Sequence, residues 1–156
     1  MSDAVTRADA TRGDTAIRPV LRGRTLVPGV VEGEALVSPE TISGWGGIDP
    51  ATGTIIEARH ALAGVCFTGR ILVFPGAKGS SGWSAFFQST RLLGTAPIGM
   101  IIGVTTAKAA LGAVVTRVPA LADADADPVA VLRTGDRIRL DATAGTVDLL
   151  RRPDRS

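Results

Sequence analysis

Two short apolar runs with a helical pattern between them constrain the fold of this chain more than any other feature. Residues 70–74, RILVF, stop at a proline, and residues 96–104, APIGMIIGV, are equally apolar, as is typical of strands buried on both faces. Between the runs, five side chains recur at helical spacing: Trp83, Phe86, Phe87, Thr90 and Leu93. Strand, helix and strand within about 35 residues predict a βαβ unit whose two strands are parallel.

The rest of the chain predicts a β-rich frame around this one βαβ unit, which places the protein in the α/β class. Residues 25–27 and 35–37 flank Gly29 and Gly33, and this pattern predicts two strands joined by a turn. Residues 107–115 have the composition of a second helix. Four more segments are predicted as short strands: residues 54–56, 129–132, 138–140 and 147–150.

The length of 156 residues fits one domain with its own core. Residues 1–20 lack periodicity and are predicted to be a disordered tail, the domain covers residues 21–150, and residues 151–156 form a C-terminal tail. The first 16 residues contain no apolar segment, so no signal peptide is expected, and the longest apolar run is too short to cross a membrane. We therefore expect a soluble, cytoplasmic protein without a membrane partner.

The charge and composition of the chain argue against nucleic acid and zinc as ligands. The formal net charge is +2, many arginines lie near the two ends, and aromatic residues make up only 4% of the chain. With few rings for base stacking and no reader motif, nucleic acid is not an expected partner. Cys66 and His60 are the only residues of their kinds, so neither an intrachain disulfide nor a four-ligand zinc site is expected. Cys66 is predicted to be a buried, unreactive thiol, and His60 to be structural rather than catalytic.

Known motifs fail at the stretch that follows the first apolar run. A Walker loop counted from Gly76 would need a glycine where Ser81 stands, and a nucleophile elbow counted from Gly79 would need one where Trp83 stands. Further on, an acidic run begins like a calcium loop but has a proline where that loop requires glycine, so it is predicted to be a solvated loop. The run comprises Asp123, Asp125 and Asp127.

The stretch KGSSG, residues 78–82, joins the first predicted strand to the helix. A glycine-rich turn before a helix presents backbone N–H groups to an anion, and Lys78 adds a full positive charge. A carboxylate, a phosphate or an enolate-like group would suit this place, and a serine there could act as a base. The structural alternative is that Ser80 or Ser81 is the N-cap of the helix. The residues alone leave both alternatives open.

Five segments in order resemble one known family. They are GWGGIDPATGTI, HALAG, GRILVFPGAKGS, LGTAPIGMII and TGDRIRLDATAGTV. Together they are similar to the small-subunit, or swivelling, domain of the aconitase X family, from about residue 22 to residue 150. The resemblance implies a swivelling β/β/α domain.

Members of this family are dehydratases, so the resemblance implies a subunit of a hydro-lyase. The larger part of such enzymes carries the cysteines of an iron–sulfur cluster and most of the substrate pocket. This chain has one cysteine, so we expect it to bind no cofactor, to have no metal site and to be active only with a separate, cysteine-bearing large subunit. The cluster iron on that partner would act as a Lewis acid on the leaving hydroxyl of a small hydroxy acid.

The resemblance also implies roles for the loop. By motif position, Ser80 matches the serine that accepts the proton, with Lys78, Gly79 and Ser81 binding substrate. Family members act on mevalonate 5-phosphate or on cis-3-hydroxy-L-proline. A composition rich in Ala, Arg, Gly and Asp favours the second, converted to Δ1-pyrroline-2-carboxylate. Phosphomevalonate dehydration is the alternative, and a non-catalytic module that binds an anion or a partner is the rival function.

The two tryptophans lie beside glycine-rich loops. Trp83 stands where the family often has a small residue, so its ring is predicted to reshape the rim of the pocket. Trp45 and Trp83 together are predicted to expose an apolar interface for a partner.

Overall fold

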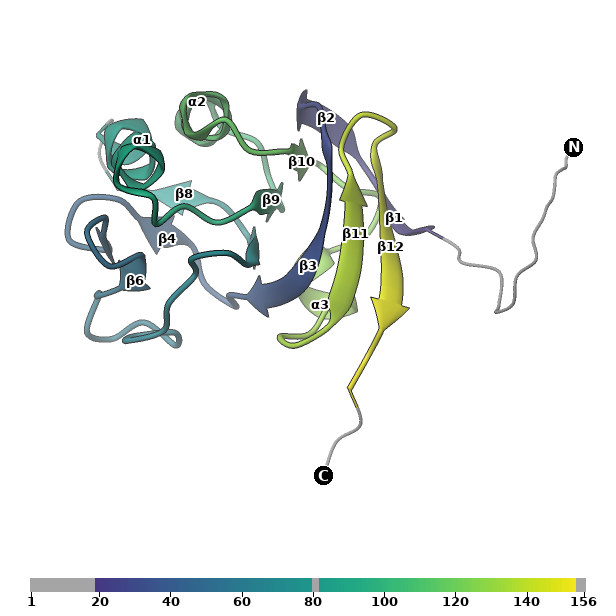
Figure 1. Cartoon of the computed structure of the whole chain (residues 1–156), viewed down its shortest axis with the longest axis horizontal. Helices are drawn as coiled ribbons and strands as arrows, with labels where there is room; N and C mark the ends of the chain where they lie inside the picture. Colours follow the sequence, from purple (N-terminus) through teal and green to yellow (C-terminus); the bar gives the residue numbers. More distant parts are fainter. Residues whose placement is uncertain (1–18, 80–81, 154–156) are drawn as a thin grey trace, which may run out of the picture.

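The computed structural model describes residues 19–79 and 82–153, and most of its strands form one mixed sheet (Figure 1). The order across this sheet is β1-β12-β11-β3-β7-β9-β10-β2. The central strands β3, β7, β9 and β10 run parallel, whereas their outer neighbours pair antiparallel. The bounds are β1 Pro19–Arg22, β2 Arg24–Val27, β3 Val30–Val37, β7 Ile71–Phe74, β9 Gly99–Ile102, β10 Ala120–Ala122, β11 Arg137–Asp141 and β12 Thr146–Arg151.

The predicted βαβ unit is confirmed. It consists of β7, helix α1 (Trp83–Leu93) and β9, with β7 and β9 in parallel register. Gly94 ends α1 in the left-handed conformation, with φ of 76°, as a C-terminal glycine cap does. A second such unit follows, in which helix α2 (Ala107–Thr116) leads from β9 to a parallel β10. The two helices pack against each other on the same face of the sheet (Figure 1).

Both faces of the central strands are buried, which explains their uninterrupted apolar sequences. Successive side chains of a strand point to opposite faces. Leu72 and Phe74 therefore join the core under α1 and α2, while Ile71 and Val73 join a second core with side chains of β1, β11 and β12. All four residues of β7 are fully buried.

The two strands predicted around Gly29 are present and are consecutive, but they do not pair with each other: β2 pairs with β10 at one edge, whereas β3 lies between β11 and β7. The segment 129–132 is not a strand, because helix α3 (Pro128–Val131) occupies it. The carboxylate of Asp127 accepts a hydrogen bond from the N–H of Val129, and a proline follows the cap, which together start a helix.

A small lobe of short strands lies beside α1 (Figure 1). It contains β4 (Ile42–Ser43), which pairs in parallel with β8 (Ala77–Lys78), and β5 (Ile48–Asp49), which pairs antiparallel with β6 (Thr54–Ile55). The lobe thus brings the chain around residue 43 next to the chain that follows β7.

The predicted tails fall largely outside the described residues, since these begin at Pro19 and end at residue 153. Pro19 already belongs to β1, and β12 continues to Arg151. Arg152 then forms an ion pair of 2.8 Å with the buried Asp136, so the folded structure extends past residue 150. None of the helices described is both long and apolar enough to span a membrane.

Candidate functional site

The connection from β7 to α1 carries the site predicted from the sequence. After β7 the chain forms β8, which is held away from the main sheet by its pairing with β4. Gly79 follows with φ of +95°, a conformation that strongly favours glycine. Ser80 and Ser81 lie outside the described residues, so their predicted roles stay predictions. Helix α1 begins with Gly82 as its N-cap residue, directly after the two serines, so the N-cap alternative also stays a prediction.

Lys78 is not a free cation in this site. Its Nζ donates a hydrogen bond of 3.0 Å to Oε2 of Glu57, which comes from the loop after β6. The two side chains are 40% and 30% exposed, so the pair lies at the surface of the lobe. The other carboxylate oxygen of Glu57, Oε1, is buried and has no hydrogen-bond partner among the described residues. The pair therefore leaves one acceptor unused beside the loop.

A second lysine reaches the same loop from α2. The ammonium of Lys108 donates a hydrogen bond to the carbonyl oxygen of Gly79, the residue directly before Ser80. None of the ion pairs among the described residues includes Lys108. The structure thus brings two lysines to the loop, one neutralised by a carboxylate and one not.

His60 has a structural role, as predicted. Its side chain is buried, Nδ1 accepts a hydrogen bond of 3.0 Å from the N–H of Leu62, and Nε2 lies 3.2 Å from the carbonyl oxygen of Thr41. Accepting at Nδ1 requires the tautomer that carries its proton on Nε2, and this proton is directed to the carbonyl. Nδ1 therefore stabilises the turn at residue 60, and Nε2 joins this turn to the loop at residue 41.

The prediction of a buried thiol at Cys66 is wrong, because Cys66 is exposed. The segment is extended and bridges to Thr54, so neighbouring side chains point in opposite directions, and Phe67 is the buried one. The described residues contain no group of three or more His, Cys, Asp or Glu side chains that could hold a metal ion. A single exposed cysteine does not make up the set of four cysteines that typically holds an iron–sulfur cluster.

The prediction that Trp83 lies at the pocket rim is also wrong. Its side chain is fully buried, its ring centroid is 4.4 Å from that of Phe87, and Nε1 donates a hydrogen bond of 2.7 Å to the carbonyl oxygen of Ile42. The ring packs onto α2 so closely that a β-carbon at Gly112 would lie 2.1 Å from it. Trp83 therefore anchors α1 to α2 and to the lobe and cannot form part of an exposed interface.

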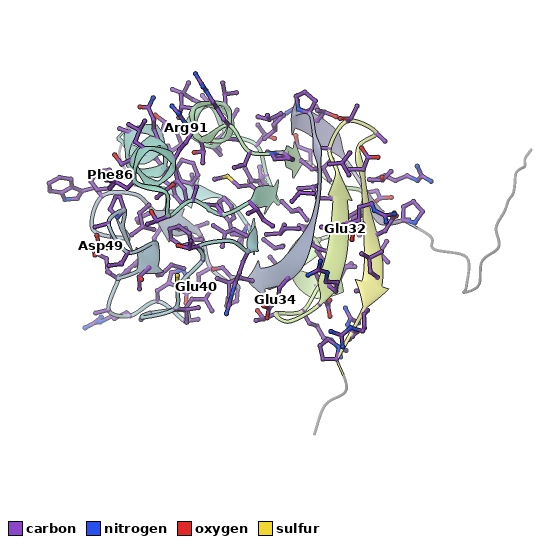
Figure 2. All side chains as sticks on the ribbon, in the orientation of Figure 1. Glu32, Glu34, Glu40, Asp49, Phe86 and Arg91 are labelled. Atoms are coloured by element: carbon purple, nitrogen blue, oxygen red, sulfur yellow. The ribbon has the colours of Figure 1, made fainter. Side chains whose placement is uncertain are left out.

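Trp45, in contrast, is exposed as predicted. It is 76% exposed, and its ring meets the edge of Phe86 at a centroid distance of 5.7 Å. Phe86 projects from the side of α1 that faces away from β3 and β11 (Figure 2). Trp45 follows Ser43, which pairs with Lys78, by two residues, so this aromatic pair lies beside the loop.

The acidic run has structural functions that the sequence alone did not show. Asp123 accepts hydrogen bonds from the backbone and side chain of Thr105 and from Arg24. The bonds from Thr105 have the largest effect. Together with the bond from Arg24 they hold the pKa of Asp123 below its usual value of 3.8, although burial acts to raise it. Asp125 accepts from the N–H of Arg22, so the run fastens the chain after β10 to β1 and β2.

Glu57 and Lys108 are the site residues that were missed from the sequence. Their contacts to residues 78 and 79 span 21 and 29 positions, respectively, so no local motif contains them. The sequence does contain one indication that Lys108 belongs to the site. Lys78 and Lys108 are the only lysines among the chain's 17 basic residues, and both lie at this loop.

Comparisons with known proteins identify the family. A family model for the aconitase X swivel domain matches residues 20–149. The phosphomevalonate dehydratase small subunit of Methanococcoides burtonii is 36% identical over 83% of this chain and 94% of its own length. The phosphomevalonate dehydratase small subunit of Methanocella arvoryzae is 38% identical over 83% of this chain and 98% of its own length. The crystal structure of Thermococcus kodakaraensis aconitase X in its holo form superposes with a TM-score of 0.80 at 37% identity, over 84% of this chain and 98% of that one. The chain therefore belongs to the aconitase X swivel domain family.

Proposed function

We propose that this chain is the small subunit of a two-chain hydro-lyase that dehydrates a phosphorylated hydroxy acid, mevalonate 5-phosphate. The observation that carries the proposal is the similarity to phosphomevalonate dehydratase small subunits over nearly their whole length. The same name is shared by relatives from Thermococcus and Pyrococcus at 35–38% identity. A small subunit requires a large one, so the functional unit is a heteromer.

The substrate preference expected from composition is not favoured by these relatives. None of those cited above is named for cis-3-hydroxy-L-proline, and a composition bias is a weaker guide to substrate than similarity along the whole domain. Dehydration of hydroxyproline stays a prediction that the same assay tests.

Within the proposed reaction, the loop of this chain handles the proton. Ser80 would take the proton from the carbon next to the substrate carboxylate, while the hydroxyl leaves from the neighbouring carbon and a double bond forms between the two. The N–H groups of the loop would stabilise negative charge that develops on the carboxylate. The positive φ of Gly79 supports this role, because it turns the backbone just before Ser80. We expect the iron–sulfur cluster to be bound entirely by the large subunit.

The test is reconstitution. The chain is co-expressed with the aconitase X large subunit of the same genome, purified anaerobically, and assayed with mevalonate 5-phosphate, mevalonate and cis-3-hydroxy-L-proline. We expect the complex to consume the phosphorylated acid with the highest kcat/KM. We also expect the purified chain alone to consume none of the three, because most of the pocket would be missing.

Two outcomes contradict the proposal. Dehydration by the isolated chain would show that no large subunit is needed. A stable complex that turns over none of the three acids would favour the rival function of a non-catalytic binding module.

A further inference from the structure

The distribution of lysine in this chain is unusual. Of 17 basic residues, only Lys78 and Lys108 are lysines, although they are 30 positions apart in the sequence. Both lie at the loop that precedes α1: Lys78 is in β8, and Lys108 donates to the carbonyl oxygen of Gly79. Lysine carries a compact charge with three rotatable donors, whereas arginine presents a flat, more weakly hydrated fork. The other 15 basic residues of the chain are all arginines.

The charges at the loop do not cancel. Glu57 neutralises Lys78 at 3.0 Å, and none of the ion pairs among the described residues includes Lys108. The bond to Gly79 uses one of the three donors of the Lys108 ammonium, which leaves two for a ligand. Lys108 is thus the net positive charge of the group, next to the residue predicted to be the base.

The position of Lys108 on its own helix is electrostatically unfavourable. It is the second residue of α2, whose first turn contains no acidic residue. The amino end of a helix carries partial positive charge, so a cation in the first turn destabilises the helix slightly. Thr106 already caps this end by accepting from the N–H of Ala109, so the lysine is not needed for capping. The stability of the helix therefore does not account for a lysine at this position.

From these observations we infer that Lys108, rather than Lys78, is the residue of this chain that binds the anionic group of the substrate. The anion is a phosphate or a carboxylate held beside Gly79. Lys78 has the separate task of fixing β8 through Glu57. This inference rests on the proposed function for the identity of the substrate but not for the existence of the anion site.

The kinetic test compares Lys108→Met, Lys108→Arg and Arg117→Met in the assembled complex. Arg117 caps the other end of α2, about 14 Å from Lys108 along the helix, and none of the ion pairs among the described residues includes it. Arg117→Met is therefore a matched control that removes one charge from the same helix. We expect Lys108→Met to raise KM by about 10- to 100-fold with kcat little changed, Lys108→Arg to recover part of the loss, and Arg117→Met to match wild type.

Assays with phosphorylated and unphosphorylated hydroxy acids distinguish phosphate binding by Lys108 from carboxylate binding. If Lys108 binds phosphate, Lys108→Met raises KM for mevalonate 5-phosphate and not for a hydroxy acid without phosphate. If it binds the carboxylate, KM rises for both. An unchanged KM, or a loss confined to kcat, would overturn the inference, because the second result describes a residue that only positions the loop.

Should the wild-type complex show no turnover, the proposed function fails and a binding measurement decides the inference alone. The full chain, labelled with ¹⁵N at lysine, gives only two side-chain ammonium signals, which Lys108→Met reduces to one. Titration with inorganic phosphate is expected to shift the Lys108 signal to saturation in wild type and in Arg117→Met. Equal, non-saturating shifts of both lysine signals would contradict an anion site at Lys108.

Discussion

The ammonium of Lys78 lies 3.0 Å from Oε2 of Glu57, and this pair fixes the strand that leads into the loop. Glu57→Gln removes the charge that holds Lys78 while keeping the size of the side chain. We expect kcat/KM of the assembled complex to fall on the order of tenfold, because a small displacement of catalytic groups has a large kinetic effect. Both partners are about one-third exposed, so thermal unfolding should shift by no more than a few degrees.

The control for this variant is Glu32→Gln. Glu32 forms a similar ion pair of 2.7 Å with Arg139, between β3 and β11. Figure 2 shows Glu32 on the strands across the molecule from Phe86 and α1. Steady-state kinetics should therefore be unchanged in Glu32→Gln. Equal effects in both variants would mean that Glu57 acts only through general charge or stability.

The part of the fold that could be predicted is the part with a local signal. The βαβ unit around α1 follows from apolar runs and helical spacing, and the direction of its strands follows from the crossover. The separation of β2 from β3 could not be predicted, since it depends on partners about 100 residues away. For α3, four apolar residues resemble a buried strand, and only the Asp–Pro pair before them indicates a helix.

The residues of the site also differ in whether a local sequence signal predicts them. Lys78 and Gly79 were predicted because one loop contains them, whereas Glu57 and Lys108 arrive through tertiary packing. At Trp83 the local pattern is the better guide. Helical spacing predicts Trp83 on the same face as Phe87 and Thr90, which is the buried face of α1. The comparison of residue size with the family predicts the pocket rim instead, which the burial of the ring contradicts.

Ser80→Ala tests the proton-transfer step. Removing a general base should lower kcat by about a hundredfold or more, while the complex still assembles. Loss of a hydroxyl near the start of a helix costs about 1 kcal/mol, which is too little to unfold the domain. Ser81→Ala is the matched control, and stopped assays with the proposed substrate would measure both. Loss of activity in Ser81→Ala alone would place the base one residue later.

The two tryptophans should respond to alanine substitution in opposite ways. Trp45 is 76% exposed, so Trp45→Ala should leave thermal unfolding of the isolated chain unchanged and weaken co-purification with the large subunit. Trp83 is fully buried against Phe74 and Phe87, so Trp83→Ala should lower the free energy of unfolding by about 3–5 kcal/mol. Denaturant titration and a pull-down assay measure the two effects. Full assembly of Trp45→Ala would assign the interface to another surface.

The last prediction concerns acid stability and the buried Asp136. Burial by itself raises the pKa of this carboxyl, but hydrogen bonds from Arg152 and from the N–H of Arg133 outweigh it and hold the pKa below 3.8. The folded protein therefore binds this proton less readily than the unfolded chain does. The stabilisation is fully present at neutral pH and is lost as pH falls below about 4 and through the lowered pKa.

Asp136→Asn should consequently lower the free energy of unfolding by about 1–3 kcal/mol at pH 7, where hydrogen bonds to a charged group are lost. The difference from wild type should shrink as pH falls, because the wild-type carboxylate is then protonated as well. Urea unfolding at pH 7 and at pH 3 measures this. Arg152→Met should reproduce the loss at pH 7, since Arg152 donates to both carboxylate oxygens. A difference that stays constant between the two pH values would mean that packing, and not the charge of Asp136, holds this end of the domain.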